Sequence, residues 1–255
     1  MAMTRKPQNL QSEKTPEYVG KESLVDGDSN LPRYNRSIVL QFAKFFGTEL
    51  KELEIGDRKR KVIDFGAGTG TLAEIFREKY MLEPVCIEVD PTLKKLLTSK
   101  KFEVHDSLEK IGFKYSYIYS SNVLEHIEND LDALIEIRSF MASNGKLAIY
   151  VPAIPFLFSE LDQKAGHYRR YSRKDLTAKV SAAGFKIEKC FYSDSLGILA
   201  TLVLKIFGYR NRFKLGDGTS LIIYDKLLYP ISQFLDRIGF RKLCGKNLLL
   251  FAVNQ

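Results

Sequence analysis

A glycine-rich turn stands between two acidic residues in the first half of the chain. The segment VIDFGAGTG places Asp64 before glycines at positions 66, 68 and 70. Glycines at this spacing allow a tight turn whose backbone can approach a ligand at a helix N-terminus. Glu88 follows 24 residues after Asp64, where a carboxylate can accept hydrogen bonds from ribose hydroxyl groups. The pattern therefore predicts a site for a nucleoside-containing cofactor.

The same turn argues against a nicotinamide dinucleotide. The dinucleotide pattern G-x-G-x-x-G would require glycine at position 71, which is Thr71. A further polar pair, His105-Asp106, follows the next apolar segment. We expect this pair to meet the edge of an adenine base.

Two loops carry side chains that can move a proton. His126 lies in VLEHI and His167 lies in GHYRRY, and imidazole is a common general base near neutral pH. Glu125 and Asp162 are the acidic candidates for the same role. The alternatives are that Glu125-His126 only caps and orients the next helix and that His167 is an ordinary loop residue.

The residues after His167 can recognise an anion. Arginine forks match carboxylate and phosphate groups, so the predicted substrate-binding residues are Tyr168, Arg169 and Arg170. The alternative is a solvated basic loop without a ligand.

Alternating strands and helices must position these groups. The apolar patterns predict strands at 61–65, 83–90, 102–106, 115–121 and 146–152, separated by helices at 71–81, 91–97 and 129–145. This rhythm is typical of a doubly wound, mostly parallel α/β sheet in a single domain.

The rest of the chain predicts a tail, further helices and two more strands. Residues 1–30 are polar and predict a flexible tail, and 34–54 predict one or two helices. A helix is expected to begin at Ser172 and stop at Gly184. Strands are expected at 185–192 and 247–254, with a helical lid insertion at 194–245 between them. In that insertion we expect Ser220 to cap a helix that kinks near Pro230, with an apolar stripe formed by Tyr224, Leu227, Leu228, Ile231, Phe234, Leu235 and Ile238.

The motifs together resemble the class I S-adenosylmethionine-dependent methyltransferases, in the methyltransferase-11/12-like group. VIDFGAGTG, IEVDP, VHD and SSNVLEHI carry the resemblance, closely over 60–153 and more loosely over 154–192; Ser116 departs from the aspartate usual there. The resemblance implies S-adenosylmethionine as cofactor and methyl transfer as the reaction. It implies that the cofactor-binding residues are Asp64, Gly66, Ala67, Gly68, Glu88, Val89, Asp106, Ser107 and Asn122.

A metal is a separate question. VLEHI also resembles the ubiquinone-biosynthesis O-methyltransferases, in which E-x-x-E-H binds a divalent cation. Here Asn122 replaces the first Glu, which leaves an oxygen ligand without its charge. We predict a site without a metal, and His167 and His126 as the catalytic candidates.

The basic excess of the chain is confined to its last part. Residues 154–255 contain 17 Lys and Arg against 8 Asp and Glu, a net +9, whereas 56–153 have a net charge of −1. The positive charge therefore falls on the part of the chain expected to bind the methyl acceptor, and it predicts an anionic acceptor. We expect O-methylation of a small or lipid-linked anionic metabolite. The alternatives are a nucleic-acid methyltransferase, although no N/D-P-P-Y/F motif follows the fourth strand, and a non-catalytic cofactor-binding adaptor.

Location follows from what the sequence lacks. Leu196 to Leu204 is too short to span a bilayer, the N-terminus has no apolar signal region, and three cysteines suit no disulfide framework. We expect a cytoplasmic protein with possible peripheral membrane contact and without a nucleic-acid partner.

Overall fold

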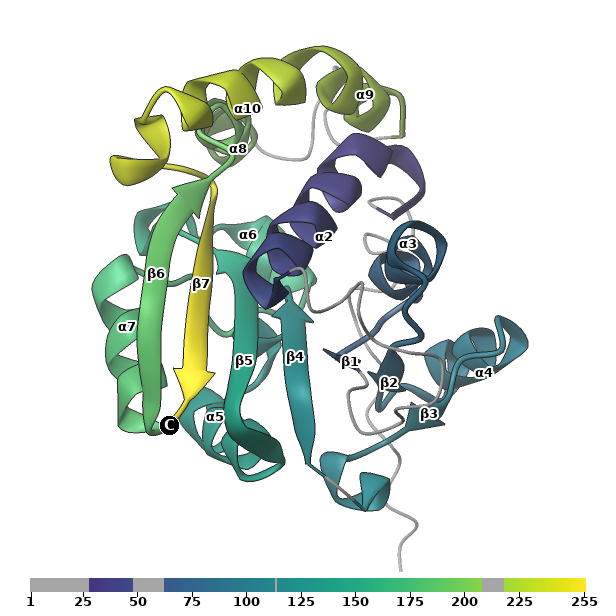
Figure 1. Ribbon diagram of the computed structural model, residues 1–255. Helices are drawn as coiled ribbons and strands as arrows, with labels where there is room; N and C mark the ends of the chain where they lie inside the picture. The colour runs from purple at the N-terminus through teal and green to yellow at the C-terminus, as the bar shows by residue number, and fades with distance from the viewer. Residues whose placement is uncertain (1–27, 48–61, 113, 208–217) are drawn as a thin grey trace, which may run out of the picture.

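The computed structural model describes residues 28–47, 62–112, 114–207 and 218–255. They form a seven-stranded sheet in the order β3-β2-β1-β4-β5-β7-β6 (Figure 1). The strands from β3 to β5 pair in parallel, and β7 is antiparallel to both of its neighbours. The predicted doubly wound, mostly parallel sheet is confirmed. The strands are β1 Val62–Phe65, β2 Val85–Ile87, β3 Val104–His105, β4 Tyr115–Ser121, β5 Met141–Pro152, β6 Phe185–Ser193 and β7 Asn247–Asn254.

Helices cover both faces of the sheet (Figure 1). On one face, α2 and α3 bury Phe42, Phe46 and Phe76 against tyrosines of β4. On the other face, α5 and α7 bury Leu134 and Leu176 in a second core cluster. The helices in this part of the fold are α2 Pro32–Phe46, α3 Thr71–Tyr80, α4 Pro91–Ser99, α5 Asp130–Ser139, α6 Glu160–Lys164 and α7 Arg173–Ala182, with short 3₁₀ turns η3 Leu108–Ile111, η4 Leu124–His126 and η5 Pro155–Leu157.

The helix predicted at 129–145 is too long, because α5 ends at Ser139 and β5 begins at Met141. The backbone N–H of Tyr115 donates to the carbonyl of Phe140 at 3.0 Å, and Tyr115 then pairs with Met141. Pairing with β4 thus takes Met141 out of the predicted helix, and β5 begins five residues before the predicted strand start at Lys146. The other predicted elements of the sheet agree with the structure to within a few residues.

A group of helices lies between β6 and β7, and we call the described residues 197–207 and 218–242 the cap. It comprises α8 Gly197–Phe207, α9 Gly218–Ile223, the π-helix η6 Tyr224–Leu228, α10 Tyr229–Arg237 and η7 Phe240–Lys242. In Figure 1 the cap stands over the edge of the sheet where the parallel strands end. The prediction that Ser220 caps a helix is wrong, because α9 begins at Gly218, and the irregular π turn comes just before Pro230.

Some predicted features fall beyond the described part of the chain. Residues 1–27 of the expected tail and residues 48–54 of the predicted helical segment lie outside it, while 28–30 form a helical turn ahead of α2. Among the described residues, no helix is both long and apolar enough to cross a membrane.

Candidate active site

The glycine loop follows β1 and leads into α3. Gly66 and Gly68 have positive φ angles of 81° and 57°, a backbone conformation that glycine adopts without strain. A Cβ atom on Gly66 would lie 2.3 Å from Cγ2 of Val123, which belongs to the turn after β4. The two turns are therefore in close contact, and only a residue without a side chain fits between them.

Glu88 follows the C-terminal end of β2 and holds this loop. Its Oε2 accepts the N–H of Gly68 at 2.8 Å, and its Oε1 accepts the N–H groups of Val89 and Asp90 at 2.8 and 2.9 Å. The side chain is buried at the mouth of the loop. A carboxylate has about four lone-pair positions, so Glu88 retains capacity for a hydroxyl group beside the glycine turn.

Asp64 is buried behind the loop. Tyr119 of β4 donates its hydroxyl group to Oδ2 of Asp64 at 2.9 Å. Burial, with Glu88 nearby, raises the pKa of Asp64 to about 7, although the bond from Tyr119 opposes the rise. The sequence did not predict Tyr119. Asp64 and Tyr119 come together only because β1 pairs with β4, and no pattern within either segment indicates that pairing.

The other predicted cofactor residues line the same edge of the sheet. Ala67 donates its N–H to the end of β2 at 3.0 Å, and Asn122 follows β4 with a positive φ of 53°. Asp106 follows β3, is partly exposed, and pairs with Lys110 at 2.8 Å, while Ser107 precedes η3. The structure thus brings the predicted positions to the ends of β1 to β4, and their contacts with a cofactor remain predictions.

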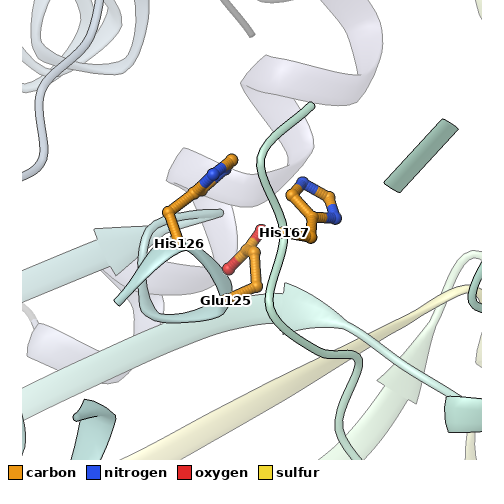
Figure 2. Close-up of side chains that lie close together, drawn as sticks. All are labelled: Glu125, His126 and His167. Carbon is orange, nitrogen blue, oxygen red and sulfur yellow. The ribbon is translucent and has the colours of Figure 1, made fainter. Parts of the chain in front are cut away.

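The two candidate histidines meet although they are 41 positions apart in the chain. Figure 2 shows the Glu125 carboxylate lying between and below the two imidazole rings in that view. The rings of His126 and His167 pack edge to face with centroids 4.5 Å apart. A backbone bond of 2.8 Å from the N–H of Tyr168 to the carbonyl of Glu125 joins the two loops.

Asp162 orients His167. Its Oδ1 lies 2.9 Å from Nδ1 of His167 and 2.8 Å from Nε of Arg170. Burial alone would raise the pKa of Asp162, but the bonds to His167 and the charge of Arg170 hold that pKa below its usual value. Because Asp162 is an ionised acceptor, Nδ1 of His167 carries the proton and Nε2 is left as the basic nitrogen.

Glu125 and His126 favour their neutral forms. Burial raises the pKa of Glu125 to about 8, and neither of its oxygens has a hydrogen-bond partner among the described residues. Burial and the neighbouring His167 lower the pKa of His126 to about 4. The pair is therefore uncharged at neutral pH.

The predicted anion-binding residues have internal partners. Arg170 is buried against Asp162, and Arg169 pairs with Asp130 at 2.8 Å. Tyr168 is exposed beside them. The sequence did not reveal these two carboxylate partners, which come from α5 and α6. Their pairing fixes the shape of the loop and leaves Tyr168 as the group most open to a ligand.

A divalent cation could be held by one set of side chains. Glu125, His126 and His167 each offer a ligand atom, and these atoms all lie within 4.8 Å of one another. Of the motif suggested by the sequence, Glu125 and His126 belong to this group. The same three residues can also act without a metal, because Asp162 already orients His167 as a base.

Comparisons with known proteins agree with this geometry. A family model described as a methyltransferase domain matches residues 29–189. No curated protein matches the sequence. Three solved chains share the fold at identities of 11 to 17%. One is described as a methyltransferase, solved with the Trm112 methyltransferase activator of Haloferax volcanii; its TM-score is 0.56 at 11% identity, covering 94% of this chain and 99% of that one.

The second is described as a sarcosine dimethylglycine methyltransferase of Galdieria sulphuraria, with a TM-score of 0.53 and 16% identity over 85% of this chain and 86% of that one. The third is a SAM-dependent methyltransferase of Archaeoglobus fulgidus, with a TM-score of 0.50 and 17% identity over 84% and 98%. At these identities the likeness concerns the fold.

Proposed function

The chain belongs to the class I S-adenosylmethionine-dependent methyltransferase family, and from this premise we propose that it methylates an oxygen atom of a small or lipid-linked anionic metabolite. The cofactor supplies an electrophilic methyl group on a sulfonium. What the chain itself must do is hold the cofactor, align the acceptor and remove a proton from it.

The residues at the strand ends fit this cofactor. Gly66 and Gly68 have positive φ angles in the loop ahead of α3, and the buried Glu88 carboxylate, bonded to the N–H of Gly68, has capacity for a hydroxyl group. Gly66 and Gly68 would lie along the methionine part, Glu88 would hold the ribose, and Asp106 would meet the adenine. Tyr119 fixes Asp64 beneath the loop.

One observation carries the choice of oxygen: the Asp162–His167 pair at 2.9 Å. A hydroxyl acceptor must lose a proton as it attacks, whereas an uncharged amine can attack with its lone pair. Asp162 holds the proton on Nδ1, so Nε2 of His167 can take the proton of the hydroxyl group. His126 packs against that ring and restricts its orientation.

Charge and exposure support an anionic acceptor. The last 102 residues carry a net charge of +9, against +8 for the whole chain. The exposed Tyr168 ring has the guanidinium carbon of Arg169 5.7 Å from its centroid. Arg169 pairs with Asp130 and donates from Nη2 to the carbonyl oxygen of Glu128 at 2.7 Å, and the other N–H groups of its guanidinium have capacity for an anion.

The test compares wild-type cells with cells that lack the protein, by untargeted analysis of metabolites and lipids. We expect a product heavier than its precursor by one methylene to disappear. The purified protein should then methylate that precursor, and His167→Ala should lower kcat by about 10²–10⁴-fold without changing S-adenosylmethionine affinity. An unchanged kcat in His167→Ala would refute His167 as the base.

Controls separate the alternatives. Asp162→Asn should shift the pH profile of kcat, because it removes the group that fixes the tautomer of His167. Chelators should leave activity unchanged; loss that manganese or magnesium restores would instead assign Glu125, His126 and His167 to a cation. Nuclease treatment that removes the acceptor would favour a nucleic-acid substrate, and failure to bind S-adenosylmethionine would favour an adaptor.

A further inference from the structure

We propose that the outer face of the cap binds the surface of an anionic lipid bilayer. Resting on the proposed function, we also infer that the acceptor is an anionic amphiphile taken from that surface. Rows of exposed apolar side chains on the cap, the cations beside them and the position of the cap over the edge of the sheet support this proposal.

The cap exposes large apolar side chains in continuous rows. On η6 and α10, Leu227, Ile231, Phe234 and Ile238 recur at helical spacing, and Leu227 and Phe234 are 63% and 60% exposed. A second row on α8 consists of Leu199, Val203 and Ile206. Isolated exposed apolar residues are ordinary, but contiguous rows on neighbouring helices are typical of a binding surface.

These rows are not needed to attach the cap, because other residues of η6 and α10, polar and aromatic, do that. Asp225 accepts the N–H groups of Arg33 and Tyr34 at 3.0 and 2.9 Å. Asp236 accepts the N–H groups of Asp194 and Ser195 at 2.8 and 3.2 Å. The buried Tyr229 and the partly buried Tyr224 pack in the core beneath the cap. Aromatic and polar side chains together therefore hold the inner side of the cap, and the apolar rows stay exposed.

The acidic and basic side chains of the cap lie on different sides of it. Asp225 and Asp236 are the two acidic residues of the segment 218–246, and both point inward. The exposed charged side chains of this segment are all cations: Lys226, Arg237, Arg241 and Lys242. An apolar strip flanked by cations matches an anionic interface, where side chains enter the acyl boundary and the cations meet headgroups.

Charge also distinguishes the bilayer from a second copy of the chain. A symmetric dimer through this face would place the cations of one cap close to those of the other. A bilayer with anionic headgroups removes that repulsion and covers both apolar rows at once. The occupant that fits both features is therefore an anionic lipid surface.

The cap is also close to the site. Its helix α8 contacts η5, which follows β5, and Lys205 of α8 donates to the carbonyl oxygen of Phe156 in η5. Phe156 is itself exposed and extends the apolar surface toward the strand ends. A protein resting on this face would bring the edge of the sheet where the parallel strands end, over which the cap stands, close to the headgroups (Figure 1).

The experiment measures flotation of the full-length protein with vesicles of phosphatidylcholine, with or without phosphatidylglycerol, at low and high salt. We expect binding to the anionic vesicles at low salt and weaker binding at high salt. Phe234→Glu should reduce partitioning at least about tenfold, and Arg237→Glu at least about fivefold. The matched control is Ile135→Glu on α5, which also replaces an exposed apolar residue but lies far from the cap.

The outcomes separate the two parts of the proposal. No flotation of wild-type protein that still binds S-adenosylmethionine, or equal loss in Ile135→Glu, would overturn the docking surface and leave the proposed methyl transfer standing. A dimer in solution that Phe234→Glu dissociates would assign the face to a second copy. Docking together with a water-soluble acceptor would overturn only the inference about the amphiphile.

Discussion

Acidic side chains that accept backbone N–H groups hold both the cofactor loop and the cap. The loop presents polar groups to a ligand, whereas the cap exposes apolar side chains. In the loop, Glu88 accepts backbone N–H groups from Gly68 and its own turn, and its carboxylate retains capacity for a further hydrogen bond. In the cap, Asp225 and Asp236 accept backbone N–H groups from distant elements, and a broad apolar face remains outside.

The difference lies in the range of the contacts. Glu88 lies 20 positions from Gly68, within one strand–helix–strand unit. Asp225 lies 191 positions from Tyr34, so the cap is positioned only when the chain ends have come together. One backbone change in the cofactor loop can alter cofactor affinity. The attachment of the cap, in contrast, can be weakened without a change in cofactor affinity.

The largest expected effect therefore lies in the loop. Gly66→Val combines a strained positive φ with a collision against Val123. Strain and overpacking of about 1–3 kcal/mol each should displace the turn and weaken S-adenosylmethionine binding by about 100-fold, measured by equilibrium dialysis.

Gly112→Ala is the matched control. Gly112 also has a positive φ, of 72°, but an added Cβ would meet nothing within 4 Å. It should cost stability through strain alone and leave cofactor affinity unchanged. Normal affinity in Gly66→Val would show that the two turns do not form the cofactor site.

The next effect concerns the attachment of the cap. The N-cap residue of α2 makes no side-chain bond, and Asp225 supplies the missing acceptor for the first turn. Asp225→Ala should lower the free energy of unfolding by about 1–2 kcal/mol, measured by urea denaturation. Asp225→Asn, which keeps one acceptor oxygen, should lose less, and cofactor affinity should stay the same in both. Equal losses in the two variants would contradict the capping role.

The same contrast in range explains what the sequence could predict. Gly66, Gly68 and Glu88 could be placed from local spacing, because a strand, a turn and a helix determine where they lie. The mostly parallel pairing of the strands followed from the alternation of strands and helices, but their order in the sheet was not predicted. The boundary between α5 and β5 could not be placed, since Met141 joins the sheet through its pairing with Tyr115 of another strand.

The histidine site was predictable only in part. His126 and His167 each stood in a plausible loop, but their contact depends on two turns meeting at the sheet edge. The roles of Asp130 and Asp162 as partners of Arg169 and Arg170 depend on the same meeting. In the cap, periodicity predicted the apolar stripe, but not which side of the helix faces outward.

A smaller effect tests whether the buried carboxyl group of Glu125 is protonated in the folded protein. Glu125 has a pKa of about 8 in the folded protein, against about 4.5 when unfolded. Its folded form therefore holds a proton that the unfolded form has lost, and this stabilisation disappears as pH rises through 8. Between pH 7 and 9 the free energy of unfolding should fall by about 1 kcal/mol.

Glu125→Gln is the control for this titration, because it keeps the shape of the side chain and removes its charge. The variant should lose this part of the pH dependence in urea denaturation. His126, whose pKa is about 4, is neutral throughout this range and does not obscure the result. An identical slope in both proteins would mean that Glu125 is ionised in the folded state.

The smallest expected effect distinguishes the cap from the core. Ile231 belongs to the exposed row of α10, whereas Ile149 of β5 is fully buried. Ile231→Ser removes apolar surface that stays in contact with water on folding, so its free energy of unfolding should change by no more than about 0.5 kcal/mol. Ile149→Ala should cost about 2–5 kcal/mol. Urea denaturation of both variants measures the difference, and a large loss in Ile231→Ser would mean that the row is packed within the folded chain. A neutral result would mean that the apolar side chains of the cap contribute little to folding and are available for binding.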